Sequence, residues 1–463
     1  MRRPNVALII VDSLRKDHSG GLDSLLELGF VKYENAVAPA PWTLPSHVSI
    51  FTGLYPSAHG VHEAYGDSPG LDEVARERMA RLGHGIAGEL MEEGYEVHFL
   101  TANLFVTPHY GFQRYTRHLT ASPYLPEALD WEEFSRLNGV LVGGGNYVAI
   151  AREFLGMGRA GLLGRAILRG MKLRMGIGLR EKGSEAILRA LRALRPVEPY
   201  MLFVNLMEAH EPYTPADLDG RVSAEAAFSA IFKGEVPRGV AAAWRRQYPR
   251  HAGYAVKRAL EVVRALGPRL DDTLVIVTSD HGQLLGDGGI GHGYFLSDDL
   301  LMVPLYVRWP SWARALRQRG LYVSLSQLPS IIRAAMGDGA AGVGTDVALA
   351  ESFGPISMPA GWRSRLTRRA LREAFSHRVR VYLRGGRFTY NLGADRLEES
   401  TGVGAAEAAE LARDLLGSAS PEELRVSARG RWPARGAGNR GARRGPRGRL
   451  SRSPQPGTRP CPP

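Results

Sequence analysis

Five short apolar runs, rich in β-branched residues, constrain the fold of this chain more than any other feature. They are NVALIIV at Asn5–Val11, YEVHFLT at Tyr95–Thr101, YMLFVNL at Tyr200–Leu206, TLVIVTS at Thr273–Ser279 and MVPLYVR at Met302–Arg308. A continuous apolar run is typical of a parallel strand that is covered on both faces. Helical stretches such as IAGELMEEG and YAVKRALEVVRAL lie between the runs and suit right-handed crossovers. The pattern predicts an α/β fold with a large, mostly parallel central sheet flanked by helices.

Length and charge limit what the chain can be. Its 463 residues, of which 44% are hydrophobic, suffice for one large α/β domain or two smaller ones. The formal charge of +12 is typical of nucleic-acid-binding proteins, but ten arginines fall in Arg429–Pro463, a segment without lysine, aspartate or glutamate. The rest of the chain has 49 basic and 47 acidic residues, so most of the net positive charge comes from the tail.

Two segments have the composition of surface contacts. Residues 429–463 are dense in Gly, Pro and Arg and lack apolar periodicity, which predicts a disordered tail. Gly158–Arg180, GRAGLLGRAILRGMKLRMGIGLR, has six basic and no acidic residues, which predicts a cationic amphipathic helix. A weak contact with an anionic membrane or with nucleic acid stays open for both segments. The alternatives are a solvated tail and a solvated helix packed on the sheet.

Cysteine usage and the N-terminus bear on the compartment. Cys461, in the tail, is the only cysteine, so the folded body has no disulfide, thiolate metal site or cysteine nucleophile. The first apolar run ends at Asp12, which makes it too short for a signal-peptide core or a membrane span. These features predict a cytoplasmic protein.

Polar residues follow three of the predicted strands at their carboxyl ends. Asp12 follows the first, His210 the third, and Asp280 with His281 the fourth. A residue in such a place often caps the next helix, but ligands of parallel sheets also bind beyond these ends. Two carboxylates and an imidazole can hold Mg²⁺, Ca²⁺, Mn²⁺ or Zn²⁺ with open positions. The sequence therefore predicts one divalent metal ion on Asp12, Asp280 and His281.

Thr43, in PWTLPSHVSIF, stands at a predicted helix start. A threonine there is placed like a nucleophile and equally like an ordinary N-cap. Coordination to a divalent cation is one of the few ways to deprotonate a threonine hydroxyl near neutral pH. We also expect backbone N–H groups around Pro45 to His47 to face an anionic phosphate or sulfate.

At these motifs the chain resembles the sulfatase family of the alkaline phosphatase superfamily. The matching segments are VDSLR, TLPSHVSIFTGLYPSAHG, TANLFVTPHYGFQRY, HEPY and DDTLVIVTSDHGQLLGDGGIGHGYFLSDDLLMVPLYV, and RVRVYLRGGRFTYNLGADRLEE is similar to the C-terminal hairpin and helix of sulfatases. The resemblance implies a catalytic α/β domain over residues 1–355, with inserts at 119–184 and 215–247. It also implies a C-terminal subdomain over 356–420, with a small antiparallel hairpin and a helix.

The resemblance implies roles for the residues at the strand ends. Thr43 stands where sulfatases have the cysteine that is oxidised to formylglycine, so it becomes the nucleophile and a metal ligand beside Asp12, Asp280 and His281. Ser13 replaces a second aspartate of many sulfatases, which favours Mn²⁺ or Zn²⁺ over Ca²⁺.

Three histidines complete the implied site. His210 falls on a substrate-contacting histidine of sulfatases, and His292 stands about where a lysine faces the sulfate. Both are candidates for catalysis and substrate binding, with interchangeable roles in protonating the leaving group. His47 stands where sulfatases have an arginine near the nucleophile, so it either contacts substrate and tunes the site or hydrogen-bonds a carbonyl.

The implied activity is metal-dependent hydrolysis of sulfuric or phosphoric esters by in-line attack of the threonine. Formylglycine cannot form at a threonine, which favours phosphate or phosphonate mono- or diesters over sulfate esters. The substrate is a small-molecule, glycan or lipid ester. The alternatives are a membrane-surface head-group phosphotransferase and a catalytically inactive sulfatase-fold binding protein. Neither the leaving group nor the oligomeric state follows from the sequence.

Overall fold

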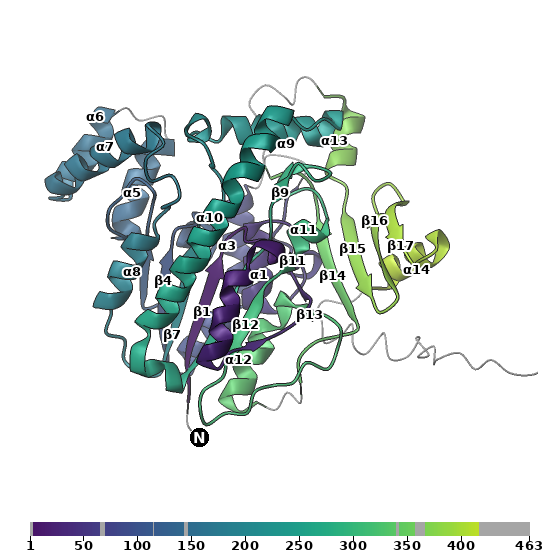
Figure 1. The fold of residues 1–463 in the computed structure, drawn as a ribbon, viewed down its shortest axis with the longest axis horizontal. Helices are drawn as coiled ribbons and strands as arrows, with labels where there is room; N and C mark the ends of the chain where they lie inside the picture. The colour runs from purple at the N-terminus through teal and green to yellow at the C-terminus, as the bar shows by residue number, and fades with distance from the viewer. Residues whose placement is uncertain are drawn as a thin grey trace, which may run out of the picture.

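The computed structural model describes residues 3–64, 70–113, 115–142, 147–338, 342–356 and 366–415. The predicted disordered tail at 429–463 lies outside these residues. The centre of the fold is an eight-stranded sheet in the order β2-β12-β8-β1-β7-β4-β5-β6 (Figure 1). Its strands are β1 Asn5–Val11, β2 Val31–Lys32, β4 Glu96–Thr101, β5 Arg117–Thr120, β6 Leu129–Asp130, β7 Tyr200–Leu206, β8 Thr273–Thr278 and β12 Leu305–Arg308.

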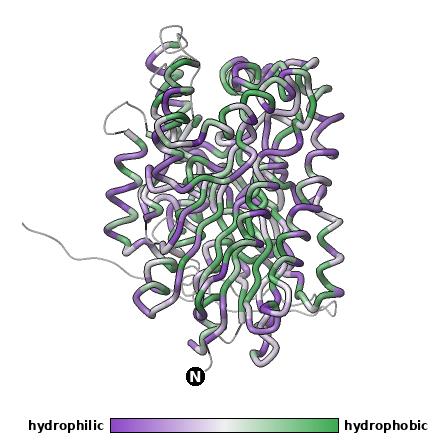
Figure 2. The backbone as a smooth tube through the Cα atoms, turned by 90° about the vertical axis from the view of Figure 1, so that its left-hand side faces the viewer, coloured by the Kyte–Doolittle hydropathy of each residue, from purple (hydrophilic) through white to green (hydrophobic). Residues whose placement is uncertain are grey.

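The five central strands, β8, β1, β7, β4 and β5, pair in parallel. In β1, Val6, Leu8 and Ile10 enter the core on one face of the sheet, while Ala7, Ile9 and Val11 enter the core on the other. This two-sided burial explains why the runs are apolar without alternation. Figure 2 shows the central strands mostly green, with purple concentrated on the outer helices.

The predicted parallel strand at Met302–Arg308 is wrong in two respects. The segment divides at Pro304 into β11 (Met302–Val303) and β12, because proline has no N–H to continue the ladder. In addition, β12 is antiparallel to β8, with Leu305 opposite Thr278. The chain stays at the carboxyl edge of β8 through residues 279–304, so the next strand starts there and runs back.

Helices cover both faces of the sheet. One face packs against α1 Thr43–Thr52, α3 Leu71–Arg81, α4 Gly85–Glu92 and α12 Leu328–Met336. The other packs against the 3₁₀ segment η2 Gly20–Leu28 and against α8 Ser184–Ala193, α9 Arg221–Lys233 and α10 Arg238–Ala265. This three-layer arrangement leaves the carboxyl ends of β1, β7 and β8 side by side at one edge.

Three further helices form a group beside the edge strands of the sheet (Figure 1). They are α5 Trp131–Val142, α6 Tyr147–Gly156 and α7 Ala160–Arg174, and they lie in the predicted insert at 119–184. A small core that includes Leu129, Phe134, Phe154 and Leu162 joins them. The group therefore has hydrophobic packing of its own.

A second sheet lies toward the C-terminus. It is antiparallel, in the order β14-β15-β16-β17, with bounds β14 Val347–Ser352, β15 Arg378–Leu383, β16 Gly386–Asn391 and β17 Arg396–Thr401, and it packs against α14 Ala405–Leu415. Because β14 pairs with β15, the sheet takes in residues ahead of position 356. Buried Arg380 binds Glu399 of β17 and Asp298 of α11 (Asp298–Leu301), which ties this sheet to the segment that follows β8.

Buried His118 of β5 predicts acid sensitivity. Its ring stacks on Phe99, and neither ring nitrogen has a hydrogen-bond partner among the described residues. Burial lowers the pKa of His118 to about 3, so stability is lost as the pH falls from about 6.5 toward that value, by about 1.4 kcal/mol per unit. We expect His118→Phe to raise the free energy of unfolding by about 2 kcal/mol more at pH 5 than at pH 8, as measured by urea denaturation.

Leu119, the next residue of β5, provides the matched control, because leucine and valine do not titrate. Leu119→Val should change the free energy of unfolding equally at the two pH values. The same pH-independent result for His118→Phe would contradict the assignment of His118 as a buried neutral imidazole.

No helix that the structure describes has both the length and the apolar character needed to cross a membrane.

Candidate active site

The predicted metal ligands meet at the carboxyl edge of the sheet. Asp12 directly follows β1, Asp280 and His281 follow β8, and all three side chains are fully buried. Thr43, 2% exposed, is the first residue of α1. One oxygen or nitrogen atom from each of Asp12, Asp280 and His281 lies within 4.8 Å of the others. The fold therefore brings residues from distant parts of the chain to one point.

The donor atoms are aimed at that point. Thr43 Oγ1 lies 3.3 Å from Asp12 Oδ2 and 3.4 Å from His281 Nε2, and His281 Nε2 lies 3.5 Å from Asp280 Oδ2. His281 Nδ1–H donates to the Gly282 carbonyl at 2.8 Å, which leaves Nε2 free as a ligand. Asp280 Oδ2 is buried without a hydrogen-bond partner among the described residues. A divalent cation fits this set of hard and borderline donors.

The electrostatics also favour a cation. Burial and the nearby charge of Asp12 raise the pKa of Asp280 well above its ordinary value. Burial would also raise the pKa of Asp12, but His210, His281, His47 and His292 lower it below the ordinary value overall. Two buried carboxylates at this distance cannot both be charged at low cost unless a positive charge stands between them.

The structure decides against Thr43 as a helix cap. Helix α1 begins at Thr43 itself, and its N-cap is Trp42, which makes no side-chain capping bond. The Thr43 hydroxyl is therefore directed to the carboxylates instead of to the helix. The expected backbone donors at Pro45 to His47 are wrong in part, because Pro45 has no N–H and Ser46 N–H donates to the Trp42 carbonyl.

Asn103 is a site residue that the sequence analysis missed. It follows β4, and its side-chain amide donates to Asp12 Oδ2 at 2.7 Å and to Thr43 Oγ1 at 3.3 Å. The amide therefore fixes the carboxylate and the hydroxyl relative to each other. The sequence feature that could have identified Asn103 is its position at the end of a predicted strand, in TANLF. Asp12 has the same kind of position in VDSLR.

Ser13 occupies the position of the missing second carboxylate. Its hydroxyl donates to Asp12 Oδ1 at 2.9 Å, and its backbone N–H donates to Asp280 Oδ1 at 3.3 Å. The backbone φ of 60° is in the left-handed region, which is uncommon for serine and turns the N–H toward Asp280. Ser13 thus supports both carboxylates without adding charge.

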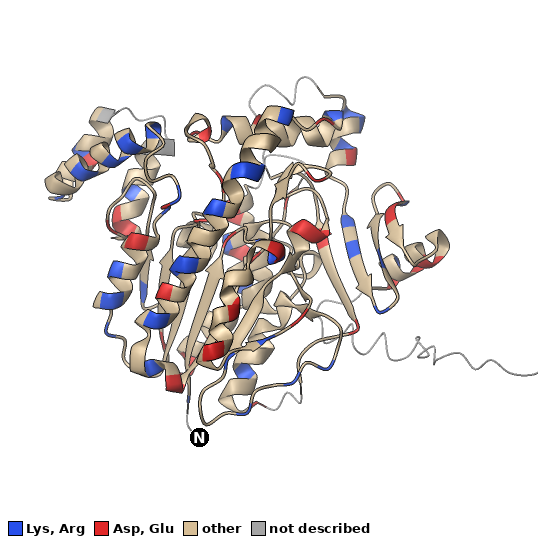
Figure 3. Ribbon diagram, viewed as in Figure 1, with Lys and Arg blue, Asp and Glu red and all other residues tan. Residues whose placement is uncertain are grey.

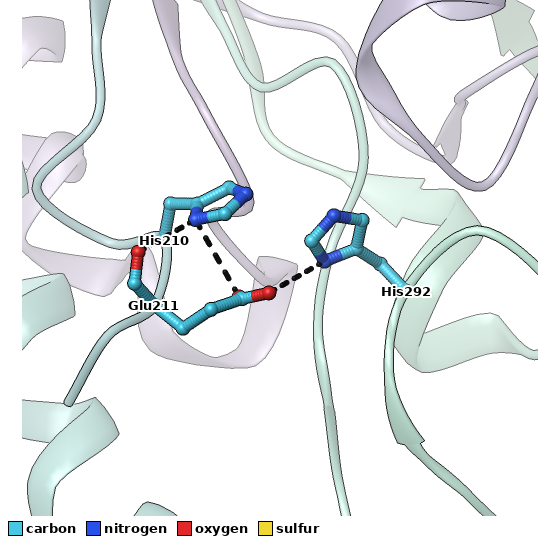
Figure 4. A group of neighbouring side chains, drawn as sticks. All are labelled: His210, Glu211 and His292. Carbon is cyan, nitrogen blue, oxygen red and sulfur yellow. Dashed lines mark hydrogen bonds and ion pairs between the residues drawn. The ribbon is translucent and has the colours of Figure 1, made fainter. Parts of the chain in front are cut away.

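A second cluster consists of His210, Glu211 and His292 (Figure 4). His210 Nδ1 lies 2.7 Å from the Glu211 carbonyl, and His292 Nδ1 lies 2.9 Å from Gln283 Oε1. Gln283 Nε2 in turn donates to Glu211 Oε2 at 2.8 Å. The rings of His281 and His292 are 4.7 Å apart, so the two clusters adjoin. Because each Nδ1 atom faces a hydrogen-bond acceptor, both Nδ1 atoms carry a proton. Both Nε2 atoms are therefore available to contact a substrate.

Glu211 supplies the charge of this second cluster. Burial would raise its pKa, but His210 and His292 lower it to about 2, so the carboxylate is ionised at neutral pH. Burial lowers the pKa of His292, and the Glu211 carboxylate, 3.6 Å from His292 Nδ1 and 3.5 Å from His210 Nδ1, opposes that shift in His292. His210, Glu211 and His292 could also hold a metal ion, but the hydrogen bonds at both Nδ1 atoms favour an orienting role for Glu211.

Lys182 lies beneath the His210 loop, and the sequence analysis missed it. Its Nζ donates to the His210 carbonyl and lies 3.3 Å from His251 Nδ1. Burial lowers the pKa of Lys182 to about 7 despite the nearby carboxylates of Glu208 and Glu211. The sequence around Lys182, EKGSE, matches no functional motif. Only the tertiary structure brings this lysine to the site.

His47 is positioned to contact the protein backbone and not to contact a substrate. Its ring is fully buried, packs edge-on against Phe203, and hydrogen-bonds the Thr43 carbonyl at 2.9 Å. It also lies 3.5 Å from Asp280 Oδ2. Of the two interpretations left open, carbonyl bonding is therefore observed, and contact with substrate is not favoured.

Comparisons with known proteins agree with the observed fold. The sulfatase family model matches residues 4–337. A phosphonate monoester hydrolase from Silicibacter pomeroyi is 16% identical, with a TM-score of 0.56, and the match covers 92% of this chain and 96% of that one. The corresponding values for a phosphonate monoester hydrolase of Agrobacterium radiobacter are 17%, 0.54, 92% and 94%. For a 2-O GAG sulfatase they are 13%, 0.54, 93% and 90%. A search of curated protein sequences finds no significant match.

Proposed function

This chain belongs to the sulfatase family and is an ester hydrolase, and we propose that it cleaves phosphate or phosphonate esters by in-line attack of Thr43. The observation that carries the proposal is the Thr43 hydroxyl, held 3.3 Å from Asp12 and 3.4 Å from His281 inside a buried metal-ligand set. A threonine cannot become formylglycine, so hydrolysis by that device is excluded. A phosphorylated threonine, in contrast, can be hydrolysed by water at phosphorus, and this favours phosphoryl over sulfuryl esters.

A divalent ion bound by Asp12, Thr43, Asp280 and His281 would lower the pKa of the hydroxyl and neutralise the ester oxygens. Asn103 holds the Thr43 oxygen in place for attack on phosphorus. As the new O–P bond forms, the bond to the leaving alcohol breaks, and His292 or His210 gives its Nε2 proton to that oxygen. The same imidazole then takes a proton from a water molecule whose oxygen attacks phosphorus. The O–P bond to Thr43 breaks, and the Thr43 oxygen takes back from solvent the proton that it gave to solvent before its attack.

The second cluster prepares the acid for this step. Glu211 stabilises the imidazolium that must donate, and Lys182 holds the backbone of His210. Gln283 bridges Glu211 and His292, so the two imidazoles and the carboxylate move as one unit. We propose a single metal ion, at the Asp12 site, with His210 and His292 facing the substrate.

The test compares matched aryl sulfate, phosphate monoester, phosphate diester and phosphonate substrates. Metal-stripped protein is refilled with Mn²⁺, Zn²⁺, Ca²⁺ or Mg²⁺ before each assay. Turnover of phosphoryl esters in preference to sulfate esters supports the proposal, and a preference for sulfate overturns it. No turnover with any metal favours an inactive binding protein, and transfer to added alcohols in place of water favours the head-group phosphotransferase.

Replacing Glu211 with glutamine should separate catalysis from metal binding. Loss of the charge removes support for the imidazolium, so we expect kcat to fall by roughly 10- to 100-fold, with the alkaline limb of the pH profile shifted to lower pH. The protein should still bind one equivalent of metal, as measured by elemental analysis. If Glu211→Gln loses a metal ion while Asp12→Asn retains one, the cluster of His210, Glu211 and His292 is a metal site instead.

A further inference from the structure

Helix α7 has an apolar face that none of the described residues covers. Leu162 and Leu173 are buried on its inner side, where the helix packs on the group formed with α5 and α6. On the outer side, Ile167, Leu168, Met171 and Met175 are each more than half exposed. At about 100° per residue, these four positions fall within an arc of about 100° on the side opposite the buried leucines.

The exposed apolar residues on this outer face lie together, whereas most exposed apolar residues on protein surfaces are scattered singly. Four large apolar side chains at adjacent positions form one contiguous patch, and such patches on soluble proteins usually mark interaction sites. The buried inner face shows that the helix does not need the outer residues for its own packing. The patch therefore calls for a partner.

Basic residues border the patch on both sides. Arg174 stands at one border, and Lys172 and Arg165 stand at the other. Residues 158–180 contain no acidic side chain, and Figure 3 shows blue segments along α7. Arg165 pairs with Glu127 at 2.7 Å, which offsets its charge, so Lys172 carries the positive charge of that border. An apolar stripe between cations is the pattern of a helix that lies in the plane of an anionic bilayer.

Other partners fit less well. A second copy of this chain, related by a two-fold axis, would bring the same cations face to face. Nucleic acid would meet four apolar side chains and no aromatic residue on which a base could stack, because residues 158–180 contain none. Anionic lipid satisfies the apolar stripe and its cationic border together.

The position of α7 connects the patch to the active site. Helix α7 lies against the 3₁₀ turn η4 (Pro215–Asp217), which follows Glu211 closely in the chain. In Figure 1, α7 lies at the end of the molecule opposite the marked N-terminus, and β1 runs toward that end. We propose that the outer face of α7, formed by Ile167, Leu168, Met171 and Met175, docks the protein on an anionic membrane surface.

The test is sedimentation of the full chain with vesicles. One set contains phosphatidylcholine with about one fifth phosphatidylglycerol, and the other contains phosphatidylcholine alone. We expect binding to the anionic set, weakened on the order of tenfold in the double variant Leu168→Glu/Met171→Glu. The matched control, Leu26→Glu/Val197→Glu, changes two exposed apolar residues elsewhere and should bind like the parent chain. Circular dichroism checks that both variants are folded.

Two further experiments distinguish membrane binding by the patch from membrane binding by the arginine-rich tail. Raising the salt from about 0.1 M to about 0.5 M shortens the Debye length from about 10 Å to roughly 4 Å, so binding by charge alone should vanish while part of the helix binding persists. A nitrobenzoxadiazole label on Met171→Cys, in a Cys461→Ser background, should shift its emission to the blue on anionic vesicles. The proposal is overturned if the double variant binds as tightly as the parent chain, or if the patch instead mediates a dimer that the double variant breaks. Because binding is measured without turnover, this result is independent of the proposed hydrolysis.

Discussion

Thr43→Ala is expected to lower kcat/KM for the best ester substrate by on the order of 10⁴-fold or more, without loss of bound metal. The reason is that the hydroxyl is the proposed attacking atom, whereas Asp12, Asp280 and His281 still offer three ligands. The Thr43 hydroxyl bonds Asp12 and Asn103, so its loss should lower the free energy of unfolding by only about 1 kcal/mol. Steady-state kinetics and elemental analysis on the same preparation measure both effects.

Two variants make this result specific. Thr43→Ser keeps a hydroxyl and should retain activity within roughly 100-fold of the parent chain, together with a phosphorylated serine that can be trapped at low pH. Thr52→Ala removes the hydroxyl at the other end of α1, which bonds the Val48 carbonyl, and should leave kinetics unchanged. Undiminished turnover by Thr43→Ala would mean that water attacks the ester directly.

The second large effect concerns Asp280, whose Oδ2 atom is buried without a hydrogen-bond partner among the described residues. Asp280→Asn should abolish tight metal binding and lower activity by on the order of 10³-fold or more. In metal-free protein the same change should raise the free energy of unfolding by roughly 1–3 kcal/mol, because it removes an unsatisfied buried carboxylate. Thermal denaturation with and without added metal should therefore rank the two proteins in opposite orders.

The pH dependence of the metal-free protein follows from the raised pKa of Asp280. The folded state holds this proton to a higher pH than the unfolded state does, so stability is greatest at low pH and is lost as the pH rises through the raised pKa. Asp280→Asn should flatten this part of the profile. Asp23→Asn, at a side chain that is half exposed and bonded to Lys32, should leave metal binding unaltered. Unchanged metal affinity in Asp280→Asn would exclude the proposed site.

Local sequence was sufficient to predict the parts of the fold that depend on local burial. The runs at Asn5–Val11 and Tyr200–Leu206 form β1 and β7 with the predicted bounds, because a strand buried on both faces leaves a continuous apolar signature. The juxtaposition of Asp12, Asp280 and His281 followed from the same pattern, since carboxyl ends of adjacent parallel strands meet at one edge. The direction of β12 did not follow, because an apolar run has no direction of its own.

Support of the site depended on contacts between distant segments. Asn103, Glu211 and Lys182 lie on loops, and their side chains reach Asp12, His292 and the His210 carbonyl only after the sheet has formed. The composition of Gly158–Arg180 likewise predicted a cationic amphipathic helix, but not which of its apolar residues would be covered. The sequence by itself determined the central parallel strands, the candidate metal-binding residues at their carboxyl ends and the threonine at the start of α1. The tertiary structure alone decided which polar groups orient them and which face of α7 stays exposed, because both depend on packing between residues far apart in the chain.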